Sequence, residues 1–218
     1  ADVLADTANI DPEAVAALIT ARTKAIVAVD YAGHPADLDE LRLIADKHGI
    51  YLIEDAAHSI GSIYKNRPIG SIADITTFSF FPTKNFTTGE GGAVASPHPE
   101  LLSRARSFAR QGLVRNTEEF QIIGEGPWHQ EVHRFGLNYR LPDVLCALGL
   151  SQLVQLDVFM KRKESIFYKY NQEFEKVDEI SIPHKKEFTR VNWHLYPLRV
   201  NPNNRLEIFN RFRELGIG

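Results

Sequence analysis

Cysteine, long apolar runs and an excess of charge of one sign are all scarce in this 218-residue sequence. The one cysteine, Cys146, excludes an internal disulfide, and the helical pattern around it does not indicate a metal site. No apolar run approaches the roughly 18 residues that a membrane-spanning helix needs. The net charge is -3 and the longest basic run is KRK, residues 161–163, so we expect neither nucleic acid nor a membrane as a partner.

Apolar residues make up 44% of the sequence, which is enough to build a sizeable core. We therefore expect a globular, cytoplasmic protein without a metal ion.

The first half of the sequence alternates helical and strand patterns, as is typical of an α/β domain. Helices are predicted at residues 13–21 and 36–49, and buried strands at residues 25–30, 50–55 and 73–81. Strands joined by helices of these lengths are parallel neighbours. Ligands gather at the carboxyl ends of such strands, where we expect Asp30, Asp55 and Lys84 to emerge.

The second half shows fewer regular patterns. We expect a strand after the turn GEGG, a helix at 98–112, an irregular segment at 113–138, a long helix from 142 to about 176, a strand at 193–200 and a helix at 205–216. Irregular segments of this length inside a compact domain are uncommon and often functional.

Lys84 is placed in an unusual environment, the run FSFFPTKNF, which surrounds one amine with aromatic side chains. Desolvation by Phe80, Phe81 and Phe86 would favour the neutral amine and make it a nucleophile toward a carbonyl. An amine of this kind forms a Schiff base with pyridoxal phosphate, which also needs a carboxylate against its ring nitrogen. Asp55, at the end of a predicted strand, fits that role.

Each of these residues also fits a structural role when it is considered alone. Lys84 could be an ordinary lysine at a strand end, Asp55 a helix cap or turn residue, and His58 a histidine satisfied within the core. Ser79, which is suited to bind a phosphate, could equally be a simple strand hydroxyl. GEGG lacks the Lys-Ser/Thr pair of a P-loop and does not open a helix, so a tight turn is the better interpretation.

Four motifs taken together favour the functional interpretation. They are EDAAH at residues 54–58, IADITTFSFFPTKN at 72–85, TTGEGG at 87–92 and GLNYRLPD at 136–143. In these motifs the sequence closely resembles the DegT/DnrJ/StrS-type sugar aminotransferases, a branch of the fold-type I pyridoxal phosphate enzymes. The resemblance implies a large domain at 1–150 with a mainly parallel sheet and flanking helices, a linking helix at 151–178, and part of a small α+β domain at 179–218.

The resemblance also implies roles for individual residues of a pyridoxal phosphate site. Lys84 would form the Schiff base and move the proton of the reaction, and Asp55 would pair with the ring nitrogen. Ala57 would lie against the ring, and His58 beside its phenolic oxygen, where many members of the family have Gln. Ser79 would bind the phosphate. Asn138 would reach the cofactor phosphate of a partner subunit, which makes a homodimer part of the site.

The run GPWHQEVHRFGLNYRLPDVLCALGLSQL, residues 126–153, narrows the resemblance to enzymes that aminate C4 of a nucleotide-linked 4-keto-6-deoxy sugar. Glutamate would be the amino donor. Compared with the family, the sequence would be truncated at both ends, without the segment that carries the rest of the phosphate site. The alternative is therefore an inactive fragment that folds and dimerises without competent cofactor binding.

Overall fold

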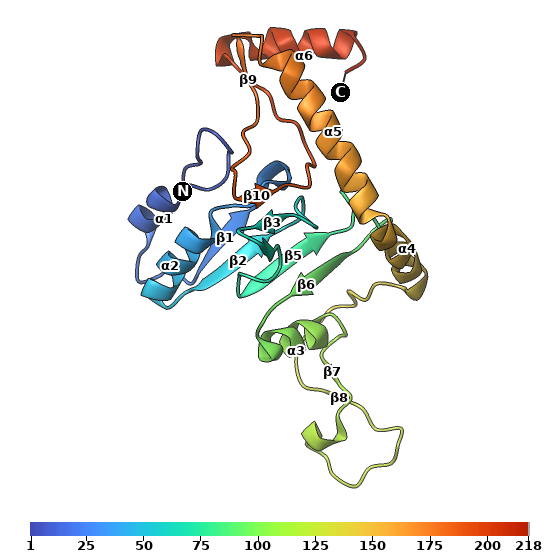
Figure 1. The fold of residues 1–218 in the computed structure, drawn as a ribbon. Helices are drawn as coiled ribbons and strands as arrows, with labels where there is room; N and C mark the ends of the chain where they lie inside the picture. The colour runs from blue at the N-terminus through green and yellow to red at the C-terminus, as the bar shows by residue number, and fades with distance from the viewer. Residues whose placement is uncertain (218) are drawn as a thin grey trace.

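The computed structural model describes residues 1–217, which fold around a central sheet of four strands in the order β1-β2-β5-β6 (Figure 1). The strands are β1 (Ala25–Val29), β2 (Tyr51–Asp55), β5 (Ile75–Ser79) and β6 (Gly92–Ala95). The first three are parallel, and β6 runs antiparallel to β5. The expected α/β class with a mainly parallel sheet is confirmed.

Two helices from the first half of the chain lie on one side of this sheet, α1 (Pro12–Leu18) and α2 (Leu38–His48). The Asp11 side chain accepts a hydrogen bond from the Glu13 amide at 2.9 Å, which caps α1. Gly49 ends α2 at φ 60°, a left-handed conformation that glycine adopts without strain.

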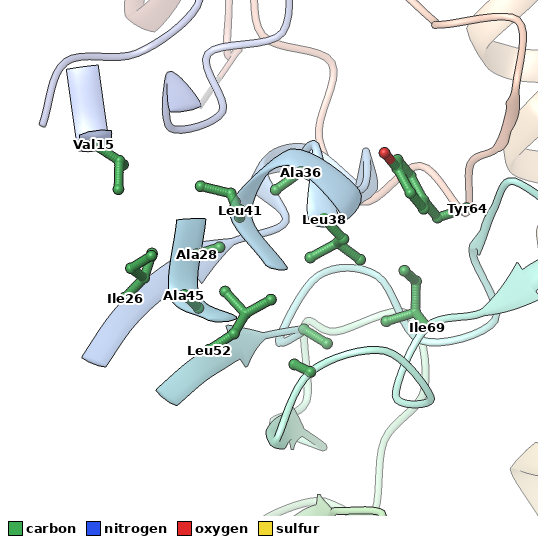
Figure 2. Packing of buried hydrophobic residues seen from close by; sticks show 12 residues of the cluster. Val15, Ile26, Ala28, Ala36, Leu38, Leu41, Ala45, Leu52, Tyr64 and Ile69 are labelled. Carbon is green, nitrogen blue, oxygen red and sulfur yellow. The ribbon is translucent and has the colours of Figure 1, made fainter. Parts of the chain in front are cut away.

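The main hydrophobic core lies between α2 and the sheet (Figure 2). The buried face of α2 carries Leu38, Leu41 and Ala45, which recur at helical spacing, and they pack toward Ile26 and Leu52 from the strands. Since this periodicity is visible in the sequence, α2 and the face that it buries could be predicted.

Smaller elements lie outside the central sheet. The strands β3 (Ile63–Tyr64) and β4 (Arg67–Pro68) join β10 (Thr189–Arg190) in a second sheet. Helix α3 (Pro99–Phe108) precedes residues 113–138, which we call the arm. In Figure 1 the arm extends away from the central sheet. The arm contains β7 (Leu113–Val114), the 3-10 turn η2 (Thr117–Glu119) and β8 (Glu131–Val132).

The prediction of one long helix from residue 142 is wrong, because the chain forms α4 (Asp143–Val154) and α5 (Leu156–Phe174) with a bend of 58° between them. Gln155 occupies the break, and its amide bonds to the Gln152 carbonyl, three residues back, which tightens and ends α4. Within residues 1–217 no single helix is long and apolar enough to cross a membrane. Only α4 and α5 taken together, as this bent pair, have the required length and apolar composition.

Packing explains the bend, since the two helices contact different segments of the chain. A Cβ on Gly149 of α4 would lie 3.3 Å from Phe86, whereas a Cβ on Gly61 would lie 2.9 Å from Met160 of α5. Sequence periodicity detects the apolar side of each helix but not the change of direction between them.

The tail contains β9 (Ile180–Ser181), β11 (Arg199–Val200), the 3-10 turn η3 (Pro202–Asn204) and the helix α6 (Arg205–Glu214). Only the end of the strand predicted at 193–200 forms, as β11. Pro197 lacks an amide donor, and Trp193 stacks on Phe167 of α5 instead of joining a sheet. The predicted domain boundaries at residues 150 and 178 stay predictions.

Candidate functional site

Two of the predicted site residues end neighbouring parallel strands. Asp55 is the last residue of β2 and Ser79 the last of β5, so both lie at the same edge of the sheet. Both are half-buried, and the Asp55 Oδ1 atom accepts a hydrogen bond from the Ala57 amide at 3.1 Å. None of the side-chain hydrogen bonds found within residues 1–217 uses the Ser79 hydroxyl.

Lys84 follows β5 on a turn that its own amide closes onto the Phe81 carbonyl at 3.0 Å. Its side chain is half-buried. Phe80 and Phe86 pack edge to face with ring centroids 4.7 Å apart, and Phe86 is buried. Phe81 is exposed and so does not enclose the amine, and shielding of Lys84 by the other two phenylalanines stays a prediction.

His58 lies within the electrostatic range of both Lys84 and Asp55. Burial lowers the pKa of its imidazole, the positive charge of Lys84 lowers it further, and the Asp55 carboxylate opposes these effects. Its Nδ1 atom is buried and has no hydrogen-bond partner in the described part of the chain. The structure thus brings together Asp55, Ala57, His58 and Lys84, with Ser79 on the same sheet edge.

Asp30 follows β1 at the predicted edge of the sheet, where its amide bonds to the Asp55 carbonyl at 3.1 Å, but its side chain does not join this group. Its carboxyl is fully buried, where it accepts hydrogen bonds from the Ser59 hydroxyl at 2.6 Å and the Ala36 amide at 2.9 Å. Burial raises its pKa, and the nearby Glu54 carboxyl raises it further. Asp30 therefore stabilises the loops behind the site.

Asn138 is also apart from the Lys84 group. It is exposed at the end of the arm, where it forms an isolated bridge with Arg110, and its Oδ1 atom accepts a hydrogen bond from Arg140 Nε at 2.8 Å. Among residues 1–217, no hydrogen bond joins it to another predicted site residue, so its expected role toward a partner subunit stays a prediction.

The GEGG segment forms a turn, as the sequence predicts. Gly91 has φ 151°, and a Cβ there would lie 2.5 Å from the Thr88 hydroxyl. Gly92 then begins β6. A Cβ on Gly92 would lie 2.6 Å from the Phe78 carbonyl oxygen, so this glycine permits the close approach of β5 and β6.

Three residues beside Lys84 were missed by the sequence analysis: Asn85, Lys163 and His194. The Asn85 carboxamide contacts Lys163 of α5 and the His194 ring, 78 and 109 residues further along the chain. No local pattern connects residues at such separations. The one available signal was that Asn85 directly follows Lys84.

Hydrogen bonds fix the segment that carries His194 to the loops after β1 and β2. The His194 amide bonds to the Ala32 carbonyl at 2.8 Å, and the Asn192 amide to the Ser62 hydroxyl at 2.8 Å. Gly33, at φ 100°, permits this approach because a Cβ there would lie 2.2 Å from the Asn192 carbonyl oxygen.

Burial makes two side chains of this region less basic than usual. It lowers the pKa of Lys163 from 10.5 to about 8 and that of His194 from 6.5 to about 4, the latter with further contributions from His58, Lys84 and Lys163. His194 is therefore neutral at physiological pH. A pocket of about 210 Å³ adjoins both side chains and is walled mainly by aromatic residues of α5 and residues 193–196.

A larger cleft, of about 760 Å³, lies elsewhere, between β6, α3 and residues 139–142. None of the predicted site residues lines it. Chemical groups, rather than cavity size, therefore locate the candidate active site at the ends of β2 and β5.

Comparison with known proteins identifies the family of this chain. Residues 1–218 match the DegT/DnrJ/EryC1/StrS aminotransferase family. A UDP-4-amino-4,6-dideoxy-N-acetyl-beta-L-altrosamine transaminase of Campylobacter jejuni is 37% identical over 96% of this chain and 55% of the relative. The chain thus spans about half the length of this relative.

Solved structures agree as well. Helicobacter pylori PseC, an aminotransferase involved in the biosynthesis of pseudoaminic acid, superposes with a TM-score of 0.90 at 30% identity, over 99% of this chain and 56% of PseC. Spr1654 of Streptococcus pneumoniae in its PLP form gives 0.87 at 29% identity, over 100% of this chain and 59% of that protein. The expected fold-type I class is confirmed, and the chain belongs to the DegT/DnrJ/EryC1/StrS aminotransferase family.

Proposed function

We propose that the protein containing this chain transfers an amino group from glutamate to C4 of a nucleotide-linked 4-keto-6-deoxy sugar. The observation that carries the proposal is the grouping of Lys84, Asp55 and His58 at one edge of the sheet, in a family of pyridoxal phosphate aminotransferases. The Campylobacter relative, which is a UDP-4-amino-4,6-dideoxy-N-acetyl-beta-L-altrosamine transaminase, supports the choice of substrate class.

The residues present fit the cofactor of this family, pyridoxal phosphate. The site offers an amine, a carboxylate with one backbone hydrogen bond, a free hydroxyl, and the buried, unpartnered Nδ1 of His58. Such an orphaned polar atom needs a partner, and a bound polar group would supply one. When bound, the cofactor supplies an aldehyde and an electron sink.

Each side chain then has a separate task. Asp55 would hold the proton on the ring nitrogen, and Ser79 would donate a hydrogen bond to the phosphate. Ala57 would lie against one ring face and leave room for it. Lys84 would bond to the cofactor aldehyde through Nζ and, once released by the amino substrate, would hold and move the proton of the substrate carbon.

A homodimer would complete the site, with Asn138 of each subunit at the partner's cofactor phosphate. Several apolar side chains of α4 are exposed in the single chain, among them Val144, Leu150 and Val154. Exposed apolar side chains in this number on one helix fit a subunit interface.

Cofactor binding to Lys84 is the first test. The purified chain mixed with pyridoxal phosphate should develop a visible absorbance band, and borohydride reduction should leave one pyridoxyl group on Lys84 by peptide mass spectrometry. Lys84→Ala should abolish both, while Lys47→Ala, a change at an exposed lysine, should not. A band that survives Lys84→Ala would overturn the assignment.

The substrate is tested with the complete reading frame and a panel of UDP- and TDP-linked 4-keto sugars. Formation of a 4-amino sugar that depends on glutamate would support the proposal, whereas no product from any of them would reject it. The alternative, a folded module without competent cofactor binding, has no support from the comparisons and predicts no band in the first test.

The role of Asn138 is tested by mixing two impaired variants of that protein, Lys84→Ala and Asn138→Ala. A mixed dimer contains one site with an intact Lys84 from one subunit and an intact Asn138 from the other. Activity above that of either variant alone would support action across the interface. Activity that does not rise on mixing would place Asn138 outside the partner's site.

A further inference from the structure

Asn85 directly follows Lys84, and its side chain makes more contacts than that of an ordinary turn residue. It is buried, and its side-chain amide contacts groups from three separate parts of the chain. Its partners are the backbone carbonyls of His58 and Asn192, the ammonium of Lys163, and the ring of His194.

The two carbonyls determine which way the Asn85 amide faces. Its Nδ2 atom donates to the His58 carbonyl at 2.9 Å and to the Asn192 carbonyl at 2.7 Å. Both amide hydrogens are thereby used, and a reversed amide would direct its oxygen at two other oxygens. The Oδ1 atom must therefore be the acceptor for the remaining two contacts.

This orientation fixes the tautomer of His194. The Asn85 Oδ1 atom lies 3.2 Å from His194 Nδ1 and also accepts from Lys163 Nζ. Because Oδ1 has no hydrogen to give, Nδ1 must carry the proton. The His194 imidazole is neutral, as its burial and the surrounding cations require, so Nε2 keeps an unprotonated lone pair.

The position of the ring makes this lone pair relevant to the site. The His194 and His58 rings lie 4.4 Å apart between centroids, and the charge of Lys84 acts on both. A neutral His194 adds no positive charge to the surroundings of the Lys84 amine. An imidazolium in its place would add one.

We propose that Asn85 is a positioning residue, which holds the Lys84 turn against α5 and residues 192–194 and locks His194 as the neutral tautomer with Nδ1 protonated and Nε2 free. Nε2 then serves as a hydrogen-bond acceptor for a hydroxyl or amino group of a ligand beside His58 and Lys84. This inference rests on the proposed function for its ligand, but the arrangement of Asn85 and His194 is a property of the chain alone.

The test uses ¹⁵N-labelled histidine in the whole 218-residue chain, without cofactor or substrate. At neutral pH the nitrogen shifts and couplings of His194, assigned by loss of its signals in His194→Gln, should show protonated Nδ1 and unprotonated Nε2. An Nε2-protonated or averaged tautomer in the unmodified chain would overturn the proposal.

The dependence on Asn85 is tested with Asn85→Asp and Asn85→Ala. A carboxylate at this position would stabilise the imidazolium, so Asn85→Asp should raise the midpoint of the His194 titration by about one pH unit or more. Asn85→Ala should remove the preference of His194 for protonation at Nδ1. This variant provides the test if the Asp variant does not fold. Asn203→Asp adds the same charge at an exposed site and should leave His194 unchanged; equal behaviour of all variants would reject the role of Asn85.

Failure of the proposed function can be told apart from failure of this inference. If no aminotransferase activity is found but His194 shows the expected tautomer and its dependence on Asn85, only the ligand assignment is lost. In an active protein, Asn85→Asp should in addition shift the pH profile of kcat/KM, which a purely structural loss would not do.

Discussion

The rings of Phe167 and Trp193 stack with centroids 3.9 Å apart and planes 7° from parallel. Phe167 lies on α5 and Trp193 in the irregular segment next to His194, so this pair joins the long helix to the site. Both side chains are almost fully buried. Since Tyr196 also packs against Phe167, the three rings form a small core separate from that of the sheet.

Phe167→Ala should therefore weaken this attachment, with a loss of about 3 kcal/mol in the free energy of unfolding, because a buried ring is replaced by a cavity. Urea denaturation followed by tryptophan fluorescence measures it, since Trp193 reports on the same contact. Lys169→Ala, an exposed change on the same helix, should cost less than about 0.5 kcal/mol. Equal effects of the two substitutions would show that α5 is not held by this stack.

The sheet and α2 could be predicted from the sequence because their information is local. Apolar residues such as Leu38, Leu41 and Ala45 recur at helical spacing, and short apolar runs mark the strands. The bend at Gln155 could not be predicted, since it depends on which surfaces Gly149 and Met160 contact. The predicted strand at 193–200 failed for a similar reason, as the burial of Trp193 against α5 overrides its strand propensity.

In the site, too, some features follow from local sequence and others from the packing of distant segments. Asp55 and Ser79 end strands and Lys84 follows one, and a parallel sheet brings such positions to one edge. Asp30 obeys the same rule of position, yet its loop folds over it and uses its carboxyl for internal hydrogen bonds. The contacts of Asn85 with Lys163 and His194 depend on how distant segments pack, which a single sequence does not reveal.

His34 makes the fold sensitive to acid. It is buried, its Nδ1 atom donates to the Pro35 carbonyl at 2.8 Å, and its Nε2 atom accepts from the Lys186 amide at 3.2 Å. Burial lowers its pKa from 6.5 to about 4. Between these pH values the unfolded chain binds a proton that the folded chain does not, so the stability falls as the pH drops through this window.

Comparison of His34→Gln with the unmodified chain tests this. At pH 7 the variant should be less stable by about 1 to 3 kcal/mol, because its hydrogen bonds are lost. The gap should narrow from pH 6.5 to pH 4 by up to about 3 kcal/mol, because only the unmodified chain loses stability when His34 becomes protonated in the unfolded state. Denaturant titrations at several pH values measure both effects, with His48→Gln as the exposed control; a gap independent of pH would contradict the assignment.

Lys163 should produce the corresponding effect in alkaline solution. Its pKa is lowered from 10.5 to about 8, so between these values the unfolded chain keeps a proton that the folded chain has released. The stability contributed by this group therefore rises with pH across the window. The unmodified chain should gain stability relative to Lys163→Met from pH 8 to pH 10.5. The other lysines and tyrosines titrate in both proteins, so their contributions to the pH dependence cancel in the difference. Two parallel curves of stability against pH would show that Lys163 is not desolvated.

Glu131 organises the arm. Its carboxylate accepts hydrogen bonds from the Gln121 and Ile122 amides, both at 2.8 Å, and from the rings of His129 and His133. The backbone bonds, first among these contacts, hold its pKa well below the usual range, so the carboxylate and its bonds persist into acid solution.

Glu131→Gln should loosen the arm without unfolding the sheet. A glutamine offers one acceptor oxygen, and its amino group faces backbone donors that it cannot satisfy. Hydrogen exchange should accelerate at the Gln121 and Ile122 amides in particular, while the strands β1 and β2 stay protected. Glu118→Gln, an exposed change in the same arm, should leave the exchange rates unaltered. If both variants exchange at the rate of the unmodified chain, the shape of the arm does not depend on the Glu131 carboxylate.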